Sequence, residues 1–230
     1  TPTGTELLHH FRDMAAAASR ISLGASGHSQ EVAGRVTITA AEMMASYRLP
    51  RVVKTIRSMA PGITIDIIAA DDVRDLLRRE ADIALRHTEP TQPDLIARRL
   101  PDSSARLYAS KAYLAELGPV RGPADLTEAQ FLAFERSDRF VQMMASFGLA
   151  VAHEAFPVVS VSGTVMHHLI RESVGIGLLP DMFARDDPDL VVVLPDADPI
   201  FFPIWLVTHR ELHTSRRIRL VFDILVQEFS

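Results

Sequence analysis

A chain of 230 residues, 47% of them hydrophobic, can bury a full core as one large or two small domains. Its formal net charge of −5 argues against a nucleic-acid-binding face on this segment, because nucleic-acid binders usually present a basic surface. The lack of cysteine excludes disulfides, thiolate catalysis and cysteine-ligated zinc, and it fits a reducing, cytoplasmic compartment.

The first predicted element is an amphipathic helix from Glu6 to Ser22. Its apolar residues recur in alternating steps of four and three, the pattern of a helix that pairs with another helix. They are Leu7, Phe11, Met14, Ala18 and Ile21. Gly24 and Gly27 end the helix, so residues 1–33 are predicted to form a linker or dimerisation helix and a hinge. Packing of this helix on its own domain is the alternative.

An alternation of strands and helices follows. Strands are predicted at Val36–Ala40, Ile63–Ala69 and Asp82–Arg86, and helices at Met44–Ala60 and Val73–Glu80. Short apolar strands that alternate with helices favour a parallel sheet covered on both faces. This part of the chain is therefore predicted to have an α/β fold.

A second alternation begins after a break rich in glycine and proline at 118–123. Before the break, strand segments are predicted at Leu95–Leu100 and Arg106–Ala109, with a helix at Ser110–Leu117. After it, strands are predicted at Phe131–Phe134, Val158–Val161, Ile176–Leu179, Val191–Leu194 and Pro203–Val207, and helices at Phe140–Phe147, Thr164–Ser173 and Ser215–Phe229. Two α/β lobes are therefore expected.

No segment is expected to enter a membrane. The longest apolar runs, Ile176–Pro180 and Ile200–Val207, are much shorter than the roughly 20 residues of a membrane-spanning helix. The first 22 residues carry Arg12 and Asp13 where a secretory signal needs an unbroken apolar core. A cytoplasmic protein is therefore expected.

Six short motifs follow one another along most of the chain. They are Gly34-Arg-Val-Thr-Ile-Thr-Ala, Ala60-Pro-Gly-Ile-Thr-Ile, Asp82-Ile-Ala-Leu-Arg86, Leu95-Ile-Ala-Arg-Arg-Leu, Leu107-Tyr-Ala-Ser-Lys and Gly175-Ile-Gly-Leu-Leu-Pro180. None is specific alone, but their order and spacing resemble the effector-binding domain of LysR-type transcriptional regulators. The opening Thr1-Pro-Thr-Gly4 resembles the residues that follow the winged helix-turn-helix of that family.

The resemblance implies a two-lobed fold similar to periplasmic binding proteins of type II, with a small effector bound between the lobes. It places lobe I at 35–128 and 206–230 and lobe II at 129–205, with crossings near Leu132 and Leu206. It further implies a homodimer or homotetramer that binds DNA through a winged helix-turn-helix absent from this chain. A transporter's solute-binding protein, which shares the two-lobed fold, is the alternative.

Candidate effector residues follow from the rule that ligands of open α/β sheets bind beyond the carboxyl ends of strands, near helix N-termini. They are Ala41, Glu42, Met43, Arg86, His87, Glu135, Arg136, Ser162, Gly163, Thr164 and Pro180. Helix capping is the alternative role of Ser162 and Thr164, and a surface ion pair that of Arg86. Glu42 makes a carboxylate-bearing effector less expected, so a polar, cationic or amphipathic effector stays open.

No metal, cofactor or catalytic centre is expected. The adjacent histidines of the pairs His9–His10 and His167–His168 point to different sides of a helix, whereas chelation favours a spacing of three or four residues. No phosphate-binding loop, nucleophile elbow or dinucleotide fingerprint is present. The protein is therefore not expected to be an enzyme.

Overall fold

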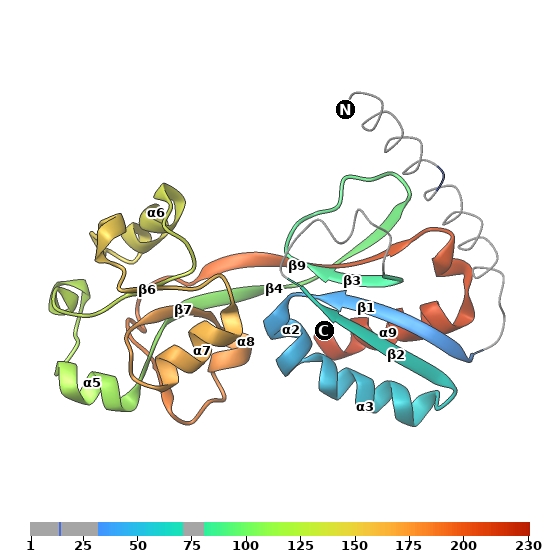
Figure 1. Ribbon diagram of the computed structural model, residues 1–230, viewed down its shortest axis with the longest axis horizontal. Coiled ribbons are helices and arrows are strands. Elements are labelled where there is room, and N and C mark those ends of the chain that lie inside the picture. Colours follow the sequence, from blue (N-terminus) through green and yellow to red (C-terminus); the bar gives the residue numbers. More distant parts are fainter. Residues whose placement is uncertain (1–13, 15–31, 71–80) are drawn as a thin grey trace, which may run out of the picture. The chain divides into compact units, whose positions relative to one another are not determined.

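The chain divides into two compact units. The computed structural model describes Met14, residues 32–70 and residues 81–230 (Figure 1). Unit 1 comprises the described residues up to Pro101 together with Ile204–Ser230, and unit 2 comprises Asp102–Pro203. The chain passes between the units inside β4 (Leu95–Ser110) and inside β9 (Ile200–His209).

Unit 1 is built on the predicted parallel strands. β1 (Gly34–Ala40) lies between β2 (Ile63–Ala69) and β3 (Ile83–Arg86), and both neighbours run parallel to it. β9 pairs antiparallel with β3, and β4 follows β9 in the order of the strands. The alternation of apolar runs thus predicted the parallel part of the sheet.

The helices of unit 1 pack against β1 and β2 and against one another. They are α2 (Glu42–Tyr47), α3 (Leu49–Met59) and α9 (Arg216–Phe229), with the short turn η3 (Leu212–Thr214) before α9 (Figure 1). Ile56 of α3 and Leu225 of α9 are fully buried in the core. The predicted helix Val73–Glu80 lies outside the described residues.

The prediction of one helix from Met44 to Ala60 is wrong. The structure has two helices, and Arg48 lies between them as the N-cap of α3. Pro50 lies in the first turn of α3, where its missing N–H removes no helical hydrogen bond. Inside a continuous helix the proline ring would clash with the preceding turn, so the helix begins anew at Leu49.

Unit 2 contains two groups of paired strands. β4 pairs antiparallel with β7 (Gly177–Pro180) and β8 (Leu190–Val192), and β5 (Leu132–Ala133) pairs parallel with β6 (Val158–Val159). The helices are α5 (Lys111–Leu117), α6 (Asp138–Ser146), α7 (Gly163–Arg171) and α8 (Asp181–Ala184), with short turns η1 (Pro123–Leu126) and η2 (His153–Ala155). The rings of Phe140 and Phe156 meet edge to face in the core, with centroids 5.4 Å apart.

The boundary between the units differs from the predicted one. Lobe I was predicted to extend to residue 128, but the division falls after Pro101. The reason is packing, because Leu107 and Leu126 belong to the buried cluster of unit 2 that also contains Phe131. The two predicted strand segments between Leu95 and Ala109 are one continuous strand, β4. The second division, after Pro203, lies near the predicted crossing.

Candidate functional site

The carboxyl ends of the parallel strands form one edge of unit 1. In the register of the sheet, Ala40 at the end of β1 is opposite Ala69 of β2 and Leu85 of β3. The helix α2 begins just beyond this edge at Glu42, whose carboxylate lies where the positive end of the helix dipole favours it. The candidate residues that follow β1 and β3 therefore lie at the same edge.

Arg86 lies buried at this edge and holds the strand ends together. Only 7% of the residue is exposed. Its Nη2 donates a hydrogen bond of 2.6 Å to Oγ1 of Thr39, and its Nη1 donates to the carbonyls of Leu85 at 3.3 Å and Ala70 at 3.4 Å. The guanidinium brings a positive charge to the edge, and Thr39 is a residue that the sequence did not indicate.

The other candidates of unit 1 differ in exposure. Met43 is buried in the core, whereas Ala41 and Glu42 are half-buried and His87 is exposed. Of these residues, Glu42 and His87 offer polar side chains that a ligand at the edge can reach.

A second edge lies at the carboxyl ends of β5 and β6 in unit 2. Each of these strands leads to a helix whose N-terminus is capped by a serine. Oγ of Ser137 accepts from the backbone N–H of Phe140 at the start of α6, and Oγ of Ser162 accepts from that of Val165 at the start of α7, both at 3.2 Å. Capping by Ser162 is therefore confirmed, and two helix N-termini lie at one edge.

The remaining candidates of unit 2 surround these caps. Glu135 accepts a hydrogen bond of 2.6 Å from the Ser137 hydroxyl, and Arg136 donates one of 3.1 Å to the carbonyl of Phe156. Gly163 is the first residue of α7. The Thr164 hydroxyl is buried without a hydrogen-bond partner among the described residues, so it does not act as a cap.

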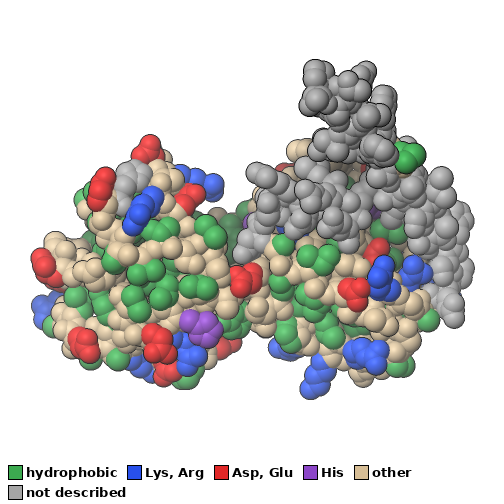
Figure 2. All heavy atoms as spheres, viewed as in Figure 1, with side chains coloured by type: hydrophobic (Ala, Val, Ile, Leu, Met, Phe, Trp, Pro, Cys, Tyr) green, Lys and Arg blue, Asp and Glu red, His purple; other side chains and the backbone are tan. Residues whose placement is uncertain are grey.

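Apolar side chains are exposed beside this edge. Val161 is 81% exposed just before the cap of α7, and Val165 is also exposed in its first turn. Figure 2 shows hydrophobic side chains on the face of unit 2 over α7. The edge therefore combines hydroxyls and charges with apolar surface, a combination suited to a small amphipathic ligand.

The last candidate, Pro180, lies beside a buried carboxylate. Pro180 ends β7 and is the N-cap of α8, and Asp181 is the first residue of that helix. Asp181 is only 4% exposed. A carboxylate so deeply buried needs hydrogen-bonding partners, because an unpaired buried charge is costly.

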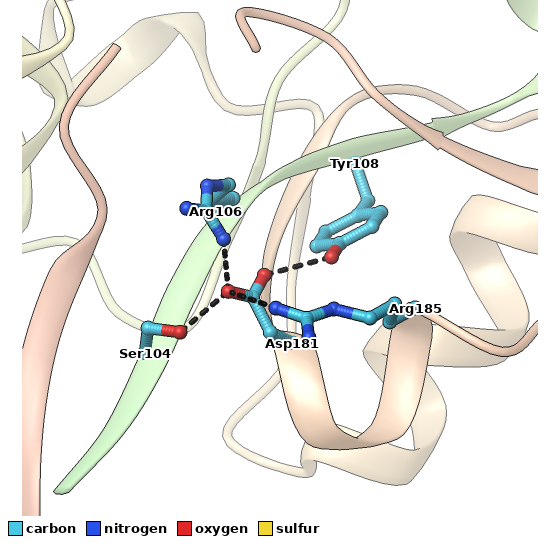
Figure 3. Close-up of polar contacts among 5 residues, drawn as sticks. All are labelled: Ser104, Arg106, Tyr108, Asp181 and Arg185. Carbon is cyan, nitrogen blue, oxygen red and sulfur yellow. Dashed lines mark hydrogen bonds and ion pairs between the residues drawn. The ribbon is translucent and has the colours of Figure 1, made fainter. Parts of the chain in front are cut away.

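Figure 3 shows the partners of Asp181. Ser104 and Arg106 donate to one carboxylate oxygen, and Tyr108 donates to the other at 2.7 Å. Arg185, one turn along from Asp181, adds an ion pair at 3.7 Å. The three partners on β4 alternate in sequence, which places their side chains on one face of the strand. Burial raises the pKa of the Tyr108 phenol, and the hydrogen bond to Asp181 raises it further.

A second charged cluster lies at the end of α7. Nε2 of His167, a buried residue, lies 3.3 Å from the carboxylate of Asp187, and Arg171 contacts the carboxylates of Asp187 and Asp189. Burial lowers the pKa of His167, and the positive charges of His168 and Arg171 lower it further against the opposing effect of Asp187. His167 therefore favours its neutral form in the folded protein.

Because of this cluster, we expect the free energy of unfolding to fall in mild acid. The unfolded chain takes up a proton on His167 below about pH 6.5, whereas the folded chain resists it until a lower pH. The contribution of His167 to stability is therefore largest above pH 6.5 and falls as the pH drops toward the folded pKa. Urea unfolding at pH 7.5, 6.5 and 5.5 should show a smaller loss for His167→Gln than for the parent chain. Equal losses in both would contradict the prediction.

Two features are absent from the described residues. Met14, residues 32–70 and residues 81–230 contain no group of three or more histidine, aspartate or glutamate side chains placed to hold a metal ion. The same residues contain no helix long and apolar enough to cross a membrane.

The geometry defines a class of protein, a two-unit α/β binding domain with polar groups at the carboxyl ends of its parallel strands. A family model described as the LysR substrate binding domain matches residues 29–230. The chain therefore belongs to this family and is the effector-binding domain of a LysR-type transcriptional regulator. Its fold is the type II fold of periplasmic binding proteins, as the resemblance to this family implied.

Known proteins similar to this chain are regulators of the same kind. The HTH-type transcriptional regulator CrgA of Neisseria meningitidis is 25% identical over 200 residues, which cover 85% of this chain and 67% of that protein. The solved regulatory domain of CrgA matches with a TM-score of 0.75 at 24% identity, covering 86% of this chain and 100% of that one. Full-length AphB of Vibrio cholerae matches with a TM-score of 0.74 at 19% identity, covering 100% and 80%. These names favour a regulator over a transporter's solute-binding protein.

Proposed function

We propose that the chain detects a small metabolite at the strand edges of its two units and thereby controls transcription by the regulator that carries it. The family match over residues 29–230 is the observation that carries this proposal. In unit 1 the proposed contacts are the residues after β1 and β3, and in unit 2 those at the capped starts of α6 and α7. In this proposal the chain binds its effector without catalysing a reaction. The regulator works in the cytoplasm.

The proposed effector is a small polar or amphipathic molecule. The buried guanidinium of Arg86 and the two helix N-termini of unit 2 favour a group that accepts hydrogen bonds. The exposed Val161 and Val165 favour an apolar part. Glu42 sets a negative charge near the same edge as Arg86, which favours a neutral or mixed-charge effector over a simple carboxylate.

The regulator is proposed to act as a dimer or tetramer whose winged helix-turn-helix domains bind DNA. The proposed pairing helix carries Leu7, Phe11, Met14, Ala18 and Ile21, of which only Met14 is described. Met14 lies in a helix, and 64% of the residue is exposed. A side chain that packs against a partner subunit is exposed in this way when one chain is considered alone. Effector binding is proposed to shift the population of two arrangements of the assembly.

Thr164 gives the sharpest test of the effector site. Since its hydroxyl has no hydrogen bond to lose, Thr164→Val should leave the free energy of unfolding within about 0.5 kcal/mol of the parent value. Against a metabolite panel, isothermal titration calorimetry should find at least one saturable ligand, and Thr164→Val should weaken it about tenfold, the effect of losing roughly 1.4 kcal/mol.

A matched control and a second measurement complete this test. Thr64→Val, at an exposed position of β2, should leave the affinity unchanged. Sedimentation with and without the ligand should show an assembly of more than one chain. No saturable ligand in the panel, or equal affinity in Thr164→Val, would contradict the proposed site, and a strict monomer at high concentration would contradict the proposed assembly.

A further inference from the structure

Unit 2 carries a hollow of about 580 Å³ that none of the candidate effector residues line. Five of its lining residues are alanines, and the hollow is called the alanine pocket below. The alanines are Ala124, Ala129, Ala150, Ala152 and Ala155. Its volume lies within the range of roughly 300 to 1,000 Å³ that is usual for small-molecule sites.

The alanine pocket lies at the opposite ends of β5 and α6 from the effector edge of unit 2. Phe131, directly before β5, lines the pocket, whereas Glu135 and Arg136 follow the end of that strand. Gly148, just beyond the C-terminal end of α6, also lines it, whereas Ser137 caps the other end of this helix. Nine helical residues span roughly 13 Å. The pocket is therefore a separate place from the edge.

The floor of the pocket is part of the core. Leu126, Phe131 and Leu149 line it, and all three are buried members of the cluster around Phe140. Side chains fixed by core packing do not need to reorganise when a ligand arrives, which lowers the free-energy cost of binding. The floor is therefore preformed.

One wall of the pocket is set by a close approach of the backbone. Gly148 has a φ of +76°, in the region that favours glycine. A Cβ at this position would lie 3.0 Å from Cγ of Pro123, the first residue of η1. The turn after α6 thus lies directly against η1, and the two segments together bound the pocket.

The lining determines which ligands fit. None of the described lining residues is charged, and Thr127 provides the one side-chain hydroxyl among them. The small alanine side chains leave the space open. The apolar floor favours an apolar ligand, because binding removes the apolar surface of both from water. We propose that the alanine pocket binds a neutral, mainly apolar small molecule, aromatic or alicyclic, with at most one hydrogen-bonding group.

Indole is a suitable probe because it is neutral, aromatic and carries a single N–H donor. Titration of the ¹⁵N-labelled 230-residue chain with indole should give saturable shifts of the amide signals of Gly148, Ala150 and Ala152. Indole-3-carboxylate, which carries a charge that no lining residue balances, should bind at least tenfold more weakly. Ala152→Leu, which fills the space, should weaken indole binding at least tenfold. Ala124→Leu, at another lining alanine, should do the same.

The control is Ala145→Leu, at an exposed alanine of α6 that does not line the pocket. It adds the same side-chain volume as the two filling variants. It should keep the parent affinity, and thermal unfolding should show that all three variants fold. The proposal is overturned if indole gives no saturable shifts, if both filling variants keep the parent affinity, or if Ala145→Leu weakens binding as much as they do. The proposal is independent of the effector site, because a metabolite that binds there would respond to Thr164→Val and not to Ala152→Leu.

Discussion

Replacing Asp181 by alanine is expected to lower the free energy of unfolding by about 3 kcal/mol, the lower end of the range for removing one partner of a buried ion pair. The substitution leaves the buried Tyr108 hydroxyl without its acceptor and Arg106 without its carboxylate. The lower end applies because the Arg106 side chain is 26% exposed and can recover part of its hydration. Urea denaturation at pH 7 measures the change.

Graded variants separate charge from hydrogen bonding in this network. Asp181→Asn keeps an oxygen that Tyr108 can donate to but removes the charge opposite Arg106, so its cost should be smaller than that of alanine. Tyr108→Phe removes a single hydrogen bond and should cost about 1 kcal/mol. Asp196→Ala, at an exposed position of the same unit, should change stability by no more than about 0.5 kcal/mol. An Asp181→Ala protein as stable as this control would show that the network contributes nothing.

The sequence predicts the framework of unit 1 well, since its strands are short apolar runs with clear ends. The runs at Ile63–Ala69 and Asp82–Arg86 needed only their composition to be recognised. The break between α2 and α3 was missed although Pro50 signalled it, because apolar periodicity continues across the break. The boundary after Pro101 left no such signal, since β4 continues through it as one strand.

The candidate site divides in the same way between local and long-range features. Ser162 could be predicted as a helix cap, because capping depends on the residues that follow it directly. The partner of Arg86 could not, since Thr39 lies 47 residues away and meets it only when β1 and β3 pair. The Asp181 network depends on Tyr108, 73 residues away. Contacts of this kind arise from strand pairing and leave no local pattern.

Removing the Phe140 ring should destabilise the chain most. Phe140→Ala is expected to cost about 3 to 5 kcal/mol, the range for deleting a buried aromatic side chain. Phe140 is 2% exposed and packs edge to face on Phe156, so the deletion loses buried area and an aromatic pair together. The surrounding cluster includes residues from α6, β4 and β7, which cannot all move to fill the cavity.

Phe201→Ala is the matched control, because it deletes the same side chain at a position that is 67% exposed. It should change the free energy of unfolding by no more than about 0.5 kcal/mol. Each unit has its own core, so thermal unfolding followed by calorimetry should show the loss from Phe140→Ala in the transition to which unit 2 contributes. If Phe140→Ala and Phe201→Ala were equally stable, the cluster around Phe140 would not be the core of unit 2, and the preformed floor of the alanine pocket would lose its basis.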